Sequence, residues 1–296
     1  MKKYLIFSLL IAVLAISTGI VFADKPEFDN LKNKAPVSIP EHAVKVSNGV
    51  FSLGEKIDPS TGKLVEGYAF LRYKKENVKT CGNGVCELGE NAKKCPEDCS
   101  DEYPDPDPDQ DTSSCYTFLA KGAKWKTAEP YLVDPINIDS LNETFIIDNL
   151  AADIAKWESA AGTNIVGDKI TGNVDRENIG ELNGKNEVIF ADIESSGAIG
   201  ITIIWGIFTG PPPFRELVEW DQVYDDVDFD WSATGESDKM DFENIATHEL
   251  GHSMGMGDLY ESTCSEITMY GYASNGETKK RSLEAGDIVG IMELYK

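Results

Sequence analysis

The stretch HELGHSMGMGD (residues 248–258) combines a helical pattern with a group of side chains that bind metals. On a helix, His248 and His252 lie on one face, one turn apart, because they are four residues apart in the sequence. Glu249 lies beside them on nearly the same side. Gly255 can adopt the left-handed backbone conformation that ends a helix. The stretch therefore predicts a helix that carries two imidazoles and a carboxylate, followed by a tight turn.

Two imidazoles in this arrangement can both direct a nitrogen to one zinc ion, at about 2.0–2.1 Å. Glu249 is suited to accept a proton from zinc-bound water, because zinc lowers the pKa of that water to about 7. A five-residue pattern can also occur by chance. Here, however, two of the three histidines of the chain fall within it, in a segment that is helical by its own pattern. The motif predicts His248 and His252 as zinc ligands and Glu249 as the catalytic base.

A zinc site needs a third protein ligand, and Asp258 is the first residue of ligand type after the helix. Gly255 and Gly257 allow the chain to turn beneath the helix and to return a side chain to the metal. The competing residues are Glu261, Cys264 and His42. An unpaired thiol is unexpected in an exported chain, and the remaining histidine lies in the N-terminal segment. Spacing and ligand type favour Asp258.

The stretch is similar to the zinc-binding pattern of the metzincins, His-Glu-x-x-His-x-x-Gly-x-x-His/Asp. Metzincins also carry a methionine turn beneath the zinc, and TMYG offers Met269. Within that group the chain most resembles the matrixins. The resemblance rests on Lys124-Trp125, on the helix that contains Ala155-Lys156-Trp157-Glu158, and on the closing LEAGDIVGIMELY, and it covers roughly residues 115–296.

This resemblance implies an α+β zincin fold: a mixed twisted sheet, a long helix, an active-site helix, and a small C-terminal subdomain with a closing helix. It implies that His248, His252 and Asp258 bind zinc, that Glu249 is the general base, and that Met269 forms an apolar floor. Matrixins have histidine at the position of Asp258. A carboxylate donates more negative charge to zinc and should make it a weaker Lewis acid.

The residue pattern supports the same architecture. Residues 141–162 predict a long amphipathic helix with Phe145, Leu150, Ile154 and Trp157 on one face. NEVIFADIE, AIGITIIWGIF and RELVEWDQVYDDVDFDW are β-rich. Residues 241–255 form the next predicted helix, with Asp241 as its N-cap. The spacing of Ile288, Ile291, Met292 and Tyr295 predicts a closing helix.

Composition divides the chain into five parts. Residues 1–23 have the layout of a secretory signal peptide, with an uncleaved membrane anchor as the alternative. Residues 24–80 form a β-rich N-terminal segment or a pro-segment, with two strands around the turn at residues 58–62. A cysteine-rich repeat (81–99) and an acidic Pro/Asp linker (100–114) precede a catalytic domain (115–296).

The chain has six cysteines, and four of them lie in CGNGVCELGENAKKCPEDC (81–99). A cytosolic chain would favour a zinc knuckle there, whereas export favours two disulfides. The segment resembles the short Notch-type cysteine repeats, whose pairing cannot be deduced from the sequence. If it pairs internally, Cys115 and Cys264 would pair with each other and tie the first strand of the domain to the loop beyond Asp258.

The net charge is −24, from 51 acidic and 27 basic residues, so nucleic acid is a poor partner. Solubility explains such a charge, and structural calcium is a second explanation because its ligands are carboxylate and carbonyl oxygens. The calcium candidates are Glu219, Asp221, Asp225, Asp226, Asp228 and Asp230. A solvated acidic face is the alternative interpretation of these residues.

The resemblance, together with these patterns, implies a secreted zinc metalloendopeptidase that hydrolyses peptide bonds by Glu249-assisted attack of zinc-bound water. The protein would lie at the cell surface if the N-terminal segment were retained, and it would have no stable membrane span if the signal peptide were cleaved. The alternatives are an extracellular binding or adhesion module on a metzincin scaffold, and a zinc hydrolase with a non-peptide substrate. No oligomeric state is predicted.

Two further hypotheses concern the cleft. By analogy, a protein or peptide substrate would add as a strand along an exposed sheet edge, for which residues 198–205 are the candidate. The alternative for that segment is a buried core strand. Residues 101–111 would reach the cleft and keep the enzyme latent, or would serve only as a solvated spacer.

Overall fold

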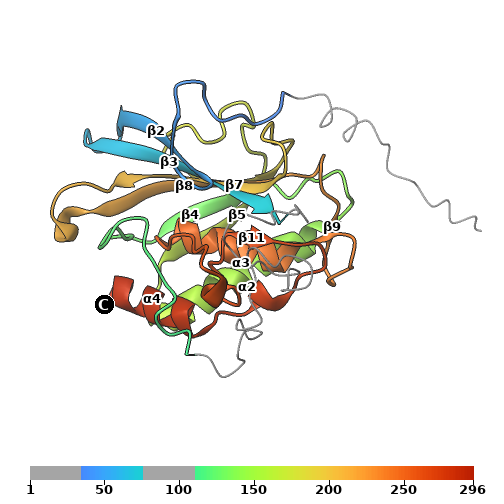
Figure 1. Cartoon of the computed structure of the whole chain (residues 1–296). Helices are drawn as coiled ribbons and strands as arrows, with labels where there is room; N and C mark the ends of the chain where they lie inside the picture. Colours follow the sequence, from blue (N-terminus) through green and yellow to red (C-terminus); the bar gives the residue numbers. More distant parts are fainter. Residues whose placement is uncertain (1–34, 76–110) are drawn as a thin grey trace, which may run out of the picture.

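The computed structural model describes residues 35–75 and 111–296. The predicted signal peptide, the cysteine repeat and most of the acidic linker lie outside the described residues. A sheet forms one layer and helices cover one of its faces (Figure 1). The strands are β1 (Val44–Ser47), β2 (Val50–Ile57), β3 (Leu64–Lys74), β4 (Glu129–Val133), β5 (Val166–Thr171), β6 (Asn186–Phe190), β7 (Ala198–Ile207), β8 (Glu216–Tyr224) and β11 (Tyr272–Ala273). A separate small sheet joins β9 (Trp231–Ser232) and β10 (Met240–Asp241).

The strand order of the main sheet is β1-β2-β3-β7-β8-β6-β4-β5, with β11 paired to β3. Strands β8, β6, β4 and β5 are parallel to one another, whereas β7 runs antiparallel to β8 and to β3. The sheet is therefore mixed, and with its helices it has the α+β architecture that the sequence predicts.

The three predicted helices are confirmed as α2 (Glu143–Ala161), α3 (Phe242–Ser253) and α4 (Ala285–Tyr295). Asn142 caps α2 by accepting a hydrogen bond from the N–H of Phe145, and Gly162 ends the helix in the left-handed conformation. The apolar face of α2 meets α3, where the Trp157 indole donates a 2.8 Å hydrogen bond to the carbonyl of Thr247. The long helix therefore supports the middle of α3.

The buried face of α4 differs from the sequence expectation. Ile291 and Leu294 are buried, whereas Ile288 and Met292 are 37% and 41% exposed. The cause is the close approach of the helix at Gly290, where an added Cβ would lie 2.5 Å from the side chain of Met256. The helix is oriented so that Gly290 faces the core. The spacing of apolar residues along the sequence does not predict this orientation.

The two N-terminal strands predicted around residues 58–62 are confirmed as β2 and β3. They extend the main sheet beside β7, as the adjacent ribbons in Figure 1 show. Strand β7 is therefore paired on both sides and almost wholly buried. The hypothesis that residues 198–205 form an exposed edge is wrong for this chain, because β3 occupies that edge.

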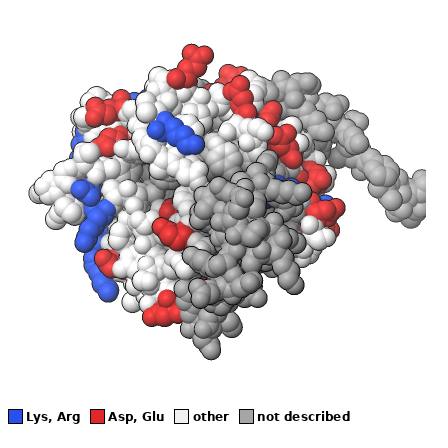
Figure 2. All heavy atoms as spheres, in the orientation of Figure 1, with Lys and Arg blue, Asp and Glu red and all other residues white. Residues whose placement is uncertain are grey.

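On the face shown in Figure 2, acidic side chains are spread over the described surface, and basic side chains are confined to a few places. Within the described residues, none of the helices has both the length and the apolar character needed to cross a membrane.

Candidate metal centre

Helix α3 places its two imidazoles and the carboxylate of Glu249 inside the molecule. Its N-cap is Asp241, as predicted, which accepts a 3.0 Å hydrogen bond from the N–H of Asn244. At the other end, the Trp125 indole donates a 2.8 Å hydrogen bond to the carbonyl of Ser253, one of the last carbonyls of the helix. His248, Glu249 and His252 are buried between these two anchors.

Backbone carbonyls fix the orientation of both imidazoles. Nδ1 of His248 lies 2.7 Å from the carbonyl oxygen of Thr268, and Nδ1 of His252 lies 3.0 Å from that of Met256. Because a carbonyl only accepts hydrogen bonds, each Nδ1 carries the proton. In its neutral form, each ring then offers a lone pair at Nε2. Both lone pairs face Asp258, with Nε2 to Oδ1 distances of 3.2 Å and 3.5 Å.

These atoms fit a metal ion. One ligand atom from each of His248, His252 and Asp258 lies within 4.8 Å of the other two. Nε2 of His248 and Oδ1 of Asp258 are buried without a hydrogen-bond partner. Buried polar atoms are normally satisfied, and a cation would satisfy this set. No other set of three His, Cys, Asp or Glu side chains converges in this way within the described parts of the chain.

The electrostatics of the cluster favour a neutral His248 and an ionised Asp258, whereas at His252 burial is outweighed by the charge of Asp258, which raises the pKa of that imidazole. Burial lowers the pKa of His248 to about 3, and the charge of Arg72 adds to this shift, so the ring is neutral at pH 7. Burial opposes ionisation of Asp258, but the two imidazoles outweigh it and hold the pKa of the carboxyl well below its usual range. A neutral imidazole and an ionised carboxylate are the ligand forms that bind zinc.

The turn after α3 brings Asp258 to the imidazoles. Gly255 has φ +104°, and a Cβ there would lie 2.9 Å from the carbonyl oxygen of Ala123, so the turn requires glycine. Leu259 then donates to the carbonyl of Met269, and Gly271 donates to that of Leu259, at 2.9 Å and 2.8 Å. These bonds join the loop of Asp258 to the methionine loop.

The competing ligands lie elsewhere. Cys264 forms a disulfide with Cys115, which confirms the predicted pairing. His42 contacts the carbonyl of Leu53, and Glu261 is exposed.

Met269 packs directly against helix α3. It is fully buried, and a Cβ at Gly251 would lie only 2.2 Å from its sulfur. Gly251 stands between His248 and His252 in the sequence, so Met269 supports the backbone that carries both imidazoles. Asp287 of α4 anchors this loop by accepting hydrogen bonds from the backbone N–H groups of Thr268 and Met269.

Two hydroxyl groups that the sequence did not indicate hold the carboxylates. Thr202 of β7 donates a 2.6 Å hydrogen bond to Oε2 of Glu249, and Oε1 is buried without a partner. Burial raises the pKa of Glu249. Tyr260 donates a 3.2 Å hydrogen bond to Oδ2 of Asp258, the oxygen that does not face the imidazoles.

The acidic residues considered for calcium divide into two groups. Asp228 and Asp230 are exposed, whereas Glu219, Asp221, Asp225 and Asp226 are buried. The solvated interpretation is therefore wrong for the buried four. Backbone N–H groups contact them: Asp221 accepts from Gly180 and Glu187, for example. Calcium at these residues stays a prediction.

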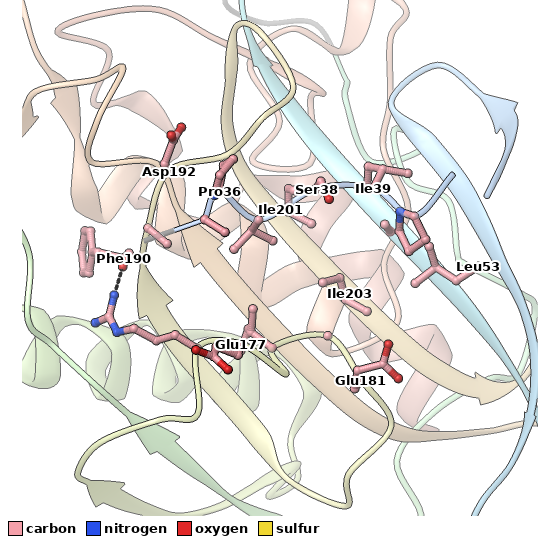
Figure 3. Close-up of a pocket in the computed structure, with 18 of the residues that line it drawn as sticks. Pro36, Ser38, Ile39, Leu53, Glu177, Glu181, Phe190, Asp192, Ile201 and Ile203 are labelled. Atoms are coloured by element: carbon pink, nitrogen blue, oxygen red, sulfur yellow. Dashed lines mark hydrogen bonds between the residues drawn. The ribbon is translucent and has the colours of Figure 1, made fainter. Parts of the chain in front are cut away.

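A cavity of about 570 Å³ lies away from the metal centre (Figure 3). Ile201 and Ile203 of β7 line it, whereas Thr202 between them contacts Glu249 on the other face of the sheet. Residues 35–40 cover this cavity. Its lining includes none of His248, Glu249, His252 and Asp258.

Comparison with known proteins agrees with the site. Residues 215–296 match the sequence model of the Matrixin family. The chain is 41% identical to human (Homo sapiens) matrilysin over 70 residues, which are 24% of this chain and 25% of matrilysin. It is 39% identical to matrilysin of Rattus norvegicus over 61 residues, which are 21% and 22% of the two chains. The matched region thus spans about a quarter of these relatives, and the similarity supports a matrixin-like metalloprotease.

Proposed function

We propose that this protein is a secreted zinc metalloendopeptidase in which His248, His252 and Asp258 hold the zinc and Glu249 is the general base. The observation that carries the proposal is the convergence of three buried acceptor atoms on one point, two of them without a hydrogen-bond partner. The similarity of residues 215–296 to matrixins supports the same assignment.

Zinc in this position would supply Lewis acidity to a peptide carbonyl and would lower the pKa of a water molecule. Glu249 would accept the proton of the attacking water at Oε1 while Thr202 holds Oε2. Burial raises the pKa of Glu249 and makes it a better base. The same carboxyl would then give the proton to the leaving amine.

The disulfide between Cys115 and Cys264 supports an oxidising compartment and therefore secretion. Structural calcium and the division of residues 1–114 into signal peptide, N-terminal segment, cysteine repeat and linker stay predictions. An adhesion module with no activity is the competing function. An inactive adhesion module would have no need for the hydrogen bond by which Thr202 holds the carboxylate of Glu249.

Chelator-sensitive cleavage of casein tests the proposal. The wild-type chain is compared with Glu249→Gln. Each protein is assayed intact and after a cut at an engineered protease site between residues 75 and 111. The cut form is included because β3 lies beside the metal centre. We expect cleavage that a zinc chelator abolishes, and a Glu249→Gln variant that binds zinc but does not cleave. Absence of chelator-sensitive cleavage from both zinc-loaded wild-type forms would favour the adhesion module.

A further inference from the structure

The loop between β7 and β8 carries an apolar tip at one end of the sheet. Residues 210–214 form this hairpin tip and have the sequence GPPPF. Phe214 is 72% exposed, the highest exposed fraction among the exposed large apolar side chains of the described residues. Figure 1 shows the loop projecting from the body of the molecule, at the left. Phe214 belongs to neither hydrophobic core of the described residues, so the ring does not hold the fold together.

Two further exposed apolar side chains lie beside the turn between β2 and β3. Ile57 and Leu64 face each other across these strands and are 61% and 52% exposed. An ion pair between Lys63 and Glu216 joins this turn to the start of β8. Both turns lie at the same end of the molecule in Figure 1. The exposed apolar surface at this end therefore includes side chains from two hairpins.

The backbone of the hairpin tip makes its hydrogen bonds within the protein. Residues 211–213 are prolines and have no N–H. Each carbonyl of residues 210–213 accepts a hydrogen bond, at 3.0 Å to 3.4 Å. The donors are the N–H of Phe214, the N–H and Nε of Arg215, and Nζ of Lys126. The tip thus meets the condition for contact with lipid, where no water is present to satisfy backbone groups.

A basic patch adjoins the hairpin tip. Its members are Lys121, Lys124, Lys126 and Arg215. Residues 116–128 and 208–215 contain no acidic side chain, although the whole chain has a net charge of −24. Nη1 of Arg215 donates a 2.9 Å hydrogen bond to the carbonyl of Lys121 and holds the two segments together. Figure 2 shows basic side chains grouped at the end of the molecule where Figure 1 places the loop. Surface charges are screened beyond about 10 Å at 0.1 M salt, so an approaching partner meets this patch rather than the net charge.

We propose that the hairpin tip and the basic patch form a docking surface for an anionic lipid bilayer. Phe214 and the three prolines enter the interfacial region, and the cations of the patch lie against the phosphates of the headgroups. The satisfied backbone of the tip favours lipid over an acidic protein, because a bilayer requires it and an acidic protein would need only the cations. Docking of this kind does not depend on catalysis at the metal centre.

Sedimentation with lipid vesicles tests the proposal. The zinc-loaded mature chain, which begins at residue 24 after removal of the predicted signal peptide, is mixed with vesicles. One set contains phosphatidylcholine alone, and the other contains phosphatidylcholine and phosphatidylglycerol in equal parts. We expect binding to the anionic vesicles that weakens as salt is raised, and much weaker binding to the neutral vesicles. Failure to bind the anionic vesicles at low salt would overturn the proposal.

Removal of two cations tests the basic patch. The Lys121→Gln, Lys126→Gln double variant should bind the anionic vesicles about 10- to 30-fold more weakly, since each cation near such a surface contributes about five-fold. Glutamine keeps an amide donor for the carbonyl that Lys126 contacts. The matched control is Lys45→Gln, Lys239→Gln, which removes the same charge from β1 and from the residue before β10, and it should bind as wild type does. Equal binding by the two double variants would contradict the proposal.

The hairpin tip is tested at Phe214. Phe214→Ser should weaken binding to the anionic vesicles by about 10-fold or more. Ile170→Ser removes an apolar side chain that is 49% exposed on β5, and it should have no effect. In Phe214→Trp, lipids with brominated acyl chains should quench the added indole more strongly than the five tryptophans of wild type. No additional quenching in the vesicle-bound variant would place the ring in water and overturn the proposal.

An acidic protein partner would give a different result. A polyglutamate peptide is titrated into wild type and the same variants. Binding of this peptide through the basic patch, without binding to anionic vesicles, would assign the surface to an acidic protein and overturn the proposal. These experiments measure association alone, so the result for the docking surface stands whether or not the chain cleaves casein. A chain that binds anionic vesicles through the tip and the patch supports the docking surface even if the peptidase function fails.

Discussion

The hydroxyl of Thr202 donates a 2.6 Å hydrogen bond to the carboxylate of Glu249 and joins the central strand β7 to helix α3. The bond fixes one oxygen of the proposed base and leaves the other without a partner. It also holds β7 beside the carboxylate of the proposed base. The sheet and helix α3 are therefore joined at the proposed base.

Thr202→Val should lower kcat/KM by about 10- to 100-fold, since a hydrogen bond to a charged group contributes about 1.5–3 kcal/mol. Valine keeps the shape of threonine and removes only the donor. Zinc content, measured by metal analysis, should stay at the wild-type level. Thr209→Val, in the exposed loop after β7, serves as the control. An unchanged kcat/KM in the cut Thr202→Val chain would show that the bond does not serve catalysis.

Asp258→Asn should weaken zinc binding strongly, because it removes the charge of a proposed ligand and keeps its size. Tyr260→Phe keeps the carboxylate and removes the hydroxyl that contacts its outer oxygen and the carbonyl of Asn48. We expect a loss of roughly 10- to 100-fold for the outer partner, and a larger loss for the ligand itself. Competition with a chelating dye measures both affinities. A wild-type affinity in Asp258→Asn would remove Asp258 from the ligand set.

How far the sequence could predict this site depends on the distance between the partners along the chain. His248 and His252 share one helix, and Asp258 follows it through a glycine turn, so local geometry was enough to bring them together as candidates. Thr202 could not be identified in this way. A shift of one residue in the register of β7 would turn Ile203 toward Glu249 instead, and register is set by pairing across the sheet.

The same limit applies to the N-terminal segment. Its two strands were predictable from composition and from the turn at residues 58–62. Their place beside β7 was not, because the pairing of Arg72 with Gly200 joins residues far apart in the sequence. A separate pro-segment and an extension of the catalytic sheet have the same local pattern. The pairing shows that these strands extend the sheet, and their removal as a pro-segment stays a prediction.

The Cys115→Ser, Cys264→Ser double variant should be less stable and should bind zinc more weakly. The disulfide closes a loop across 149 residues, and its loss should lower the free energy of unfolding by about 2–5 kcal/mol. It also holds the segment between Asp258 and Met269 to the start of the domain. Denaturant unfolding and zinc titration measure the two effects. Zinc affinity equal to wild type would show that the disulfide stabilises the fold without positioning the site.

Asp153→Asn should change how stability depends on pH. Asp153 lies buried in α2, where burial raises its pKa to about 7 although the charge of Lys156 partly offsets the shift. The native state therefore holds this proton more tightly than the unfolded state, whose pKa is about 3.9. Unfolding releases the proton between about pH 4 and 7, so the contribution of Asp153 to stability falls as pH rises through that window. A difference of about 3 units corresponds to about 4 kcal/mol at most.

The measurement is the free energy of unfolding in denaturant at intervals from pH 4 to 8, for wild type and Asp153→Asn. Other buried carboxyls titrate in both proteins, so the contribution of Asp153 is the difference between the two curves. We expect the curve of the variant to fall less steeply with rising pH. Parallel curves would mean that Asp153 is ionised throughout this range, with Lys156 and the amide of Asn149 outweighing its burial.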